Sequence, residues 1–354
     1  MSEDGKAPGG TGTGPTGGGA AKPTPPARDP VAEAAALAAL EQEESGQALR
    51  DKPQPAAKKL DETRQTGAET PIAKGKVEAG EDKREPLEKP PVVKFDKVTK
   101  TYPGGFTAIK DVTFEIPDYP GRGEFVSILG PSGCGKSTVI RMIAGLLPQF
   151  PQSSGKILID GKPVKGPGPD RGMVFQDYTS FDNRSVLENV AFGLECRGMA
   201  KAERLDRARL WIGKVGLSVK RDGDKYPHEL SGGMRQRVAI ARTLILEPRI
   251  ILMDEPFGAL DPPTRSRMQD NLVELWREQS PTIFFITHSF EEAVYLGDHV
   301  LLFSNSPGTI LEQIRIPPPD RPSIEMQRDP KFVDIVRGIR ETIDRLESSN
   351  RAGD

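Results

Sequence analysis

The chain of 354 residues has little of several features that would place it in particular protein classes. Its two cysteines are too few for a disulfide framework or a cysteine-based metal site, so reduced thiols are expected. No stretch reaches the roughly 18 to 20 uninterrupted apolar residues of a membrane span, and the Gly/Thr/Pro-rich start lacks the positive charge and apolar core of a signal peptide. These absences favour a soluble, cytosolic protein.

A large excess of charge of either sign is also missing. The formal net charge is −2 and the sequence pI is about 6.1. Nothing in this balance indicates a general affinity for nucleic acid or anionic lipid, so nucleic acid is not expected as a partner. Any association with a membrane would have to run through a protein partner.

Aromatic residues are absent from the first quarter of the chain, where none occurs before Phe95. Residues 1–91 are rich in Gly, Pro, Ala, Glu and Lys, and such a segment has too little apolar area to offset the entropy of ordering. A disordered extension is therefore expected for residues 1–91, with no function inferred for it. Residues 92–319 are expected to form one folded unit, followed by a helical tail over residues 320–354.

A strand, a glycine-rich loop and a helix follow one another in the order needed to bind phosphate. An antiparallel hairpin comes first, around Pro103-Gly104-Gly105, followed by a buried strand over Glu124–Leu129 and a helix over Lys136–Leu147. Glycines let backbone N–H groups surround a phosphate, Lys136 would neutralise the β- and γ-phosphates, and the Ser137 hydroxyl would bind Mg²⁺. The flanking strand and helix count against the alternative of a glycine-rich turn with a surface lysine. The loop residues expected to bind ATP are Gly130, Pro131, Ser132, Gly133, Cys134, Gly135, Lys136, Ser137 and Thr138.

Two carboxylates follow a second apolar run, Ile250–Met253, which predicts a strand buried on both faces. Asp254 is expected to hold Mg²⁺, and Glu255 to polarise the attacking water as a general base. Paired acids after a strand often simply cap the next helix, which is the competing interpretation. The neighbouring phosphate loop favours the catalytic one.

From about Val92 to Pro319 the sequence resembles the ATP-binding subunit of a bacterial ABC importer. The resemblance implies an α/β P-loop NTPase fold with an antiparallel β subdomain and a helical subdomain at about residues 178–235. It also implies roles for single residues: Tyr102 stacks on adenine, Gln176 senses the γ-phosphate and Mg²⁺, and His288 contacts the γ-phosphate. The expected catalytic residues are Glu255, His288 and Gln176; the expected metal ligands are Ser137, Gln176 and Asp254.

The signature of this family lies in Leu230-Ser231-Gly232-Gly233-Met234, and it implies a dimer. Ser231 and Gly233 match residues that contact the γ-phosphate from the opposite subunit, at the start of a helix that continues to Leu244. That site faces away from its own phosphate loop, so two chains must pack head to tail around two ATP molecules. The signature residues expected to contact ATP in the partner are Ser231, Gly232, Gly233, Met234 and Gln236; Asp261, in Ala259-Leu260-Asp261, matches the loop that crosses the dimer interface.

The resemblance further implies a membrane subunit that docks on the helical subdomain, where Ser185 is a plausible helix cap. Candidate contacts are Tyr178, Phe181, Val186 and Leu187, although any of them could instead fill the subdomain core. A finer resemblance, to nitrate, sulfonate and taurine ATPases, rests on short runs that include Gly166–Arg171 and Ser306-Pro307-Gly308. The sequence departs from that branch at Asp182-Asn183-Arg184 and at Pro262-Pro263; the second pair suits a helix start.

Apolar residues of the tail line one helical face. The helix is expected to pack on the nucleotide-binding domain or on its twin, with regulation as a further possibility. The members of this face are Phe332, Ile335, Val336, Ile339, Ile343 and Leu346.

The leading hypothesis is a transport ATPase on the cytoplasmic side of the cell membrane, working with a second ATP-binding subunit, identical or paralogous. Transmembrane permease subunits and, indirectly, a solute-binding protein are its other expected partners, and ATP and Mg²⁺ its expected cofactors. A soluble ABC mechanoprotein acting on ribosomes or DNA is the competing class. Such proteins usually carry two cassettes or long coiled-coil insertions, and this sequence has neither. A P-loop small-molecule kinase is disfavoured because it has no use for the Leu-Ser-Gly-Gly run.

Overall fold

The computed structural model describes residues 85–177, 179–258 and 260–351, with side chains as far as Arg345. The expected disordered extension lies mostly outside the described residues, as do Tyr178 and Ala259. Backbone hydrogen bonding to the folded unit starts at Leu87, whose N–H donates to the Asp118 carbonyl over 2.8 Å.

A six-stranded sheet forms the centre of the fold, in the order β10-β9-β3-β8-β7-β6. Neighbouring strands from β9 to β6 run parallel, and only β10 is antiparallel to its neighbour β9. The carboxyl ends of β3, β6, β7 and β8 therefore meet at one edge, where parallel sheets bind ligands. The strands are β3 (Phe125–Leu129), β6 (Arg171–Val174), β7 (Ile250–Asp254), β8 (Thr282–Ile286), β9 (His299–Phe303) and β10 (Ile310–Arg315).

A second, antiparallel sheet has the order β2-β1-β4-β5. The predicted hairpin is present, and its turn is closed by a 2.8 Å hydrogen bond from Tyr102 N–H to the Phe106 carbonyl. The strands are β1 (Val93–Thr101), β2 (Thr107–Ile116), β4 (Ser154–Ile159) and β5 (Lys162–Pro163).

Both faces of the central sheet are buried, as the apolar runs predicted. Along β7, Ile250 and Leu252 belong to one hydrophobic cluster, while Ile251 and Met253 belong to the other. Side chains alternate between the faces of a strand, so four consecutive apolar residues supply two cores at once.

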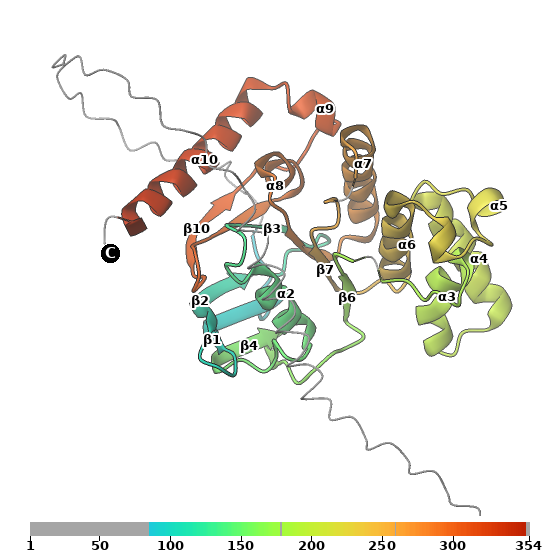
Figure 1. Cartoon of the computed structure of the whole chain (residues 1–354), viewed down its shortest axis with the longest axis horizontal. Helices are drawn as coiled ribbons and strands as arrows, with labels where there is room; N and C mark the ends of the chain where they lie inside the picture. Colours follow the sequence, from blue (N-terminus) through green and yellow to red (C-terminus); the bar gives the residue numbers. More distant parts are fainter. Residues whose placement is uncertain (1–84, 178, 259, 352–354) are drawn as a thin grey trace, which may run out of the picture. The chain divides into compact units, whose positions relative to one another are not determined.

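Helices cover both faces of this sheet (Figure 1). Helix α2 packs with the antiparallel sheet on one face, and α7, α8 and α10 contribute to the cluster on the other. The helices are α2 (Lys136–Ala144), α3 (Val186–Cys196), α4 (Lys201–Lys214), α5 (Val219–Asp222), the 3₁₀ turn η1 (Pro227–Glu229), α6 (Gly232–Leu244), α7 (Pro262–Gln279), α8 (Phe290–Leu296), α9 (Ser323–Met326) and α10 (Pro330–Arg351).

Helix α2 is shorter than predicted, because it ends at Ala144 and not at Leu147. Gly145 adopts a left-handed conformation (φ 76°), and its N–H bonds back to the carbonyls of the last turn. A Cβ at Gly145 would overlap the Gly166 backbone, so the chain turns here around a contact that is distant in sequence.

Helices α3 to α5 and the start of α6 lie together at one side of the molecule (Figure 1). Ser185 caps α3 as predicted: its side chain accepts from Glu188 N–H, and the Glu188 side chain accepts from Ser185 N–H. Val186 is buried in the core, so its expected contact with a membrane subunit is wrong. Phe181, by contrast, is 38% exposed and packs against Phe192, with a centroid distance of 4.4 Å.

The C-terminal helix α10 packs on its own chain, chiefly against α8. Phe332, Val336 and Ile339 are buried in the same cluster as the central sheet, and Ile343 is packed against it. The predicted apolar face is therefore used within the chain.

Candidate functional site

The loop between β3 and α2 wraps around the amino group of Lys136. Lys136 is buried, and its Nζ donates to the carbonyls of Gly130 and Pro131, both over 2.8 Å. Gly135 has φ 94°, and a Cβ there would overlap Ile109 and approach the Ala108 carbonyl within 2.9 Å. Only glycine fits this position, which explains why the loop can turn so tightly under β2.

Ser137 and Asp254 meet although they are far apart in sequence. The Ser137 hydroxyl donates to Asp254 Oδ1 over 2.9 Å, because β3 and β7 end at the same edge of the sheet. Asp254 Oδ2 is buried and accepts no hydrogen bond, with Arg141 Nη2 3.6 Å away. Burial raises the pKa of the Asp254 carboxyl, opposed by the Ser137 hydrogen bond and the Arg141 charge. A hydroxyl beside a carboxylate oxygen with free lone pairs suits Mg²⁺, which prefers oxygen ligands.

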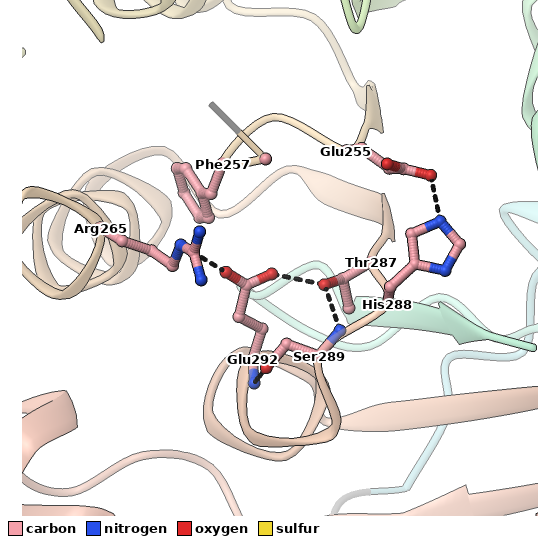
Figure 2. Close-up of a pocket in the computed structure, with 8 residues that line it drawn as sticks. Glu255, Phe257, Arg265, Thr287, His288, Ser289 and Glu292 are labelled. Carbon is pink, nitrogen blue, oxygen red and sulfur yellow. Dashed lines mark hydrogen bonds and ion pairs between the residues drawn. The ribbon is translucent and has the colours of Figure 1, made fainter. Parts of the chain in front are cut away.

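Glu255 and His288 form a pair at the mouth of the same edge. The Nε2 of His288 lies 2.5 Å from Glu255 Oε1 (Figure 2), and both side chains remain accessible. Glu255 has φ 46°, a left-handed conformation that is costly outside glycine and asparagine. This turn directs the carboxylate out of the strand axis and towards the loop that follows β8.

A cleft of about 340 Å³ joins these residues to the hairpin of the antiparallel sheet. Tyr102 lies in its wall, with its hydroxyl 3.3 Å from Thr138 Oγ1. Phe106 stacks beside Tyr102 with a centroid distance of 6.4 Å and is half exposed. Sequence reasoning missed Phe106; an aromatic residue at a polar hairpin tip was the available signal. The other cleft residues are Ala108, Ser132, Gly133, Gly135, Lys136, Ser137, Glu255 and His288.

Among the described residues, the Ser137 hydroxyl bonds Asp254, and no hydrogen bond joins Gln176 to either residue. Gln176 lies in the turn after β6, at the correct edge of the sheet, and its side chain is exposed. Its role as a sensor and metal ligand therefore stays a prediction.

The predicted second anion site begins α6. Ser231 is exposed and caps the helix by accepting from Met234 N–H over 3.4 Å. Ser231, Gly232, Gly233 and Met234 do not line the cleft around Lys136. The Gln236 side chain is completely buried, and neither of its polar atoms has a hydrogen-bond partner. An interior side chain cannot reach an ATP held by another subunit, so the expected contact of Gln236 is wrong.

The loop before α7 touches this signature. A Cβ on Gly233 would lie 2.7 Å from Leu260 Cδ2, so the Leu260 side chain packs against the first turn of α6. Asp261 caps α7 by accepting from Thr264 N–H over 3.1 Å. Hydrogen bonding from the Thr264 side chain, and then from this N–H, lowers the pKa of the Asp261 carboxyl. Pro262 and Pro263 open the helix, as their missing N–H groups allow.

A second cavity of about 290 Å³ shares Glu255 and His288 with the cleft around Lys136 (Figure 2). It is lined by both members of the pair and by residues that sequence reasoning did not single out as a site. Two of these residues are Arg265, on α7, and Glu292, on α8. The remaining lining residues are Phe257, Gly258, Thr287 and Ser289.

Comparisons with known proteins agree with this geometry. A family model described as ABC transporter matches residues 109–258. An uncharacterized ABC transporter ATP-binding protein of Methanocaldococcus jannaschii is 46% identical over 252 residues, which cover 69% of this chain and 91% of that protein. The chain belongs to the ABC transporter ATP-binding family. It is therefore an ABC ATPase, and the predicted α/β cassette fold is confirmed.

Relatives of this ABC ATPase include importer subunits, as the finer resemblance predicted. The nitrate import ATP-binding protein of Synechocystis is 44% identical, with 65% of this chain and 85% of that protein aligned. The taurine import ATP-binding protein of Rhizobium johnstonii is 50% identical, over 58% of this chain and 74% of that protein. A solved ATP-binding cassette, dimeric and bound to ADP and Pi, superposes with a TM-score of 0.56 at 33% identity, covering 64% of this ABC ATPase and 99% of that chain.

Among the helices of this ABC ATPase that the structure describes, none has the length and apolar character to cross a bilayer.

Proposed function

We propose that this ABC ATPase powers the import of a small solute, of the nitrate, sulfonate or taurine class, through separate membrane subunits. It works as a dimer on the cytoplasmic face of the membrane, and a solute-binding protein delivers the cargo to the permease. The observation that carries the proposal is the shared cleft of Lys136, Ser137, Glu255 and His288. The names of the importer relatives support the class of cargo.

ATP hydrolysis needs a group that binds the phosphates and a general base, and the cleft has a candidate for each. Lys136 would turn its amino group from the loop carbonyls to the β- and γ-phosphates. Glu255 would take up the proton of the attacking water, and His288, 2.5 Å from it, would contact the γ-phosphate and hold the carboxylate in place. Tyr102, with Phe106 beside it, would stack on the adenine.

Mg²⁺ would be held by the Ser137 hydroxyl and the Asp254 carboxylate, with Gln176 as a further ligand. The ion would supply charge neutralisation on the β- and γ-phosphate oxygens. Among the described residues, no cluster of three or more His, Cys, Asp and Glu side chains offers another metal site.

Each cleft would be completed by the other subunit. The Ser231 end of α6 is an exposed helix N-terminus, and such an end with free N–H groups attracts anions. It would close over the γ-phosphate in the partner's cleft, with Leu260 and Asp261 crossing the interface. Because the γ-phosphate is what bridges the halves, its loss on hydrolysis would favour their separation.

The membrane subunit would dock on the helical subdomain. Phe181 presents a partly exposed ring there, supported by Phe192 and by the Arg242 guanidinium 5.5 Å from its centroid. Beside these rings, Arg184 pairs with Glu195 over 2.9 Å. Arg184 belongs to Asp182-Asn183-Arg184, where the sequence departs from the importer branch, so this polar run would form part of the docking surface.

The proposal is tested by affinity capture of the Glu255→Gln chain, with ATP, from detergent-solubilised native membranes, followed by mass spectrometry. Recovery of a multi-span permease, lost in a Phe181→Asp chain, is expected. Recovery of ribosomal or DNA-associated proteins with no permease would contradict the transport proposal and favour a soluble mechanoprotein.

A further inference from the structure

Glu292 on α8 is bonded to the residues on both sides of His288, to Thr287 through its buried carboxylate and to Ser289 through its backbone N–H. Glu292 is 7% exposed, and its Oε2 accepts a hydrogen bond from the Thr287 hydroxyl. Its own N–H donates to Ser289 Oγ over 3.1 Å, and the Ser289 N–H donates to Thr287 Oγ1 over 3.0 Å. His288 therefore projects from between two residues of one hydrogen-bonded loop, in which the Glu292 carboxylate holds the Thr287 hydroxyl (Figure 2).

The same carboxylate reaches across to α7. Gln269 Nε2 donates to Glu292 Oε1 over 3.2 Å, and Arg265 Nε lies 3.6 Å from that oxygen. Arg265 also donates, through Nη2, to the Leu260 carbonyl over 3.0 Å. Glu292 thus connects the loop that carries His288 with the loop that precedes α7.

Burying a carboxylate costs solvation free energy, and its hydrogen bonds and ion pairs need not offset that cost. A buried ion pair or network is often no more stabilising than apolar residues of the same volume. Burial raises the pKa of Glu292, while the hydrogen bond from Thr287 and the charge of Arg265 oppose the shift. Two donors, from Thr287 and Gln269, and the nearby charge of Arg265 converge on this carboxylate, and Thr287 directly precedes the accessible His288.

We infer that Glu292 is a positioning residue for ATP hydrolysis, whose carboxylate sets the His288 imidazole against Glu255 by fixing the Thr287 hydroxyl, which in turn accepts from the Ser289 N–H. Through its ion pair with Arg265, Glu292 also links the position of the His288 ring to the Leu260 backbone. The inference rests on the catalytic role proposed for the Glu255–His288 pair. Both residues line the cavity that Glu292 and Arg265 close on the opposite side.

The test compares Glu292→Ala and Glu292→Gln in the full chain, by steady-state ATPase kinetics and thermal melting. Glu292→Ala is expected to lower kcat about ten- to a hundredfold, since small misplacements of catalytic groups have effects of this size, while KM for ATP stays within about twofold. Glu292→Gln keeps an oxygen acceptor for Thr287 and should recover part of the rate. The control is Glu325→Gln, an exposed acid on α9 outside this network, with kcat unchanged.

A double-mutant cycle separates positioning from stability. If Glu292 acts through His288, Glu292→Ala should cause no further loss in a His288→Ala chain. The same fold loss in both backgrounds, or a Glu292→Ala chain with normal kcat, would overturn the inference.

Imidazole NMR gives a readout that does not depend on activity. The chain has three histidines, so the ring signals of His288 are those that disappear in His288→Ala. Glu292→Ala should move these signals and leave His228 and His299 in place, whereas unmoved His288 signals would contradict positioning. The ATPase and NMR results concern the chain alone, so a failure to capture a permease would count against transport only.

Discussion

Gly308 packs directly on the carbonyl oxygen of Cys134, in the middle of the phosphate loop. A Cβ at Gly308 would overlap that oxygen. The Gly308 N–H donates to the Ala108 carbonyl over 2.9 Å. The segment Ser306-Pro307-Gly308, which in sequence was only a mark of one family branch, thus supports the loop from behind.

Gly308→Ala should therefore weaken nucleotide binding without touching the nucleotide. The contact is between backbone atoms and cannot be relieved by a rotamer change, so a destabilisation of about 1–3 kcal/mol is expected. Thermal melting and the ATP dissociation constant would measure it. In Gly213→Ala the new methyl group meets open space on α4, so this control should be neutral or slightly stabilising; equal behaviour of the two variants would disprove the contact.

Glu255→Gln should abolish turnover while preserving ATP binding. Removal of a general base typically lowers the rate by about 10² to 10⁴, and the amide keeps the size of the side chain. Phosphate release and nucleotide affinity measured side by side test this expectation. Glu312→Gln, an exposed change on β10, is the control, and ordinary turnover of the Glu255→Gln chain would remove Glu255 from the role of base.

Tyr102→Ala should raise the ATP dissociation constant. Stacking of a base on an aromatic ring is worth about 1–3 kcal/mol by alanine substitution, or roughly five- to a hundredfold in affinity. Phe106→Ala should have a smaller effect, because Phe106 supports the first ring. Titration with a fluorescent ATP analogue would rank them, and Tyr226→Ala, an exposed aromatic outside the cleft, should not change the affinity.

The stability of the helical subdomain should depend on Asp222 and on pH. Asp222 is buried and bonds Arg221, Lys225 and the Ser218 N–H, and the hydrogen bond from Arg221 contributes most to holding its pKa far below the usual 3.8. A carboxyl with a lowered folded pKa stabilises the fold above the unfolded value, and this contribution is lost as pH falls through the folded one.

Asp222→Asn should accordingly lower the Tm at pH 7, and the difference from wild type should shrink below about pH 3.8, the ordinary value. Asp224→Asn, an exposed change two positions away, should not alter the Tm. A constant Tm difference between the Asp222→Asn chain and wild type across the whole pH range would contradict this account.

Features whose cause is local could be predicted from the sequence. The phosphate loop, the strand before Asp254 and the cap Ser185 depend on residues within a few positions of one another, where composition and periodicity are informative. The family resemblance then added the order of motifs around them.

Features that depend on contacts between residues distant in the chain could not be predicted from the sequence. Helix α2 stops at Ala144, where Gly145 packs against the Gly166 backbone, which follows β4 and β5 in the chain. In the sequence, Leu146 and Leu147 continue the helical pattern. Gln236 occupies the buried side of α6, which only the packing partners of that helix decide. Glu292 and Gly308 are ordinary residues in sequence and gain their importance only beside Thr287 and Cys134.

The place of β8 in the sheet affects how this protein is made. β8 lies between β3, which leads into the phosphate loop, and β7, which ends at Asp254. The two strands that flank β8, β3 and β7, are synthesised before it. The Ser137–Asp254 contact therefore has to wait for β8 (Thr282–Ile286), and the Glu255–His288 pair has to wait for the synthesis of His288. A nascent chain stalled at residue 258, where the family match ends, would hold both acids and the phosphate loop yet lack the strand that joins them. Nucleotide binding would then arise late in translation, after most of the cassette has been built.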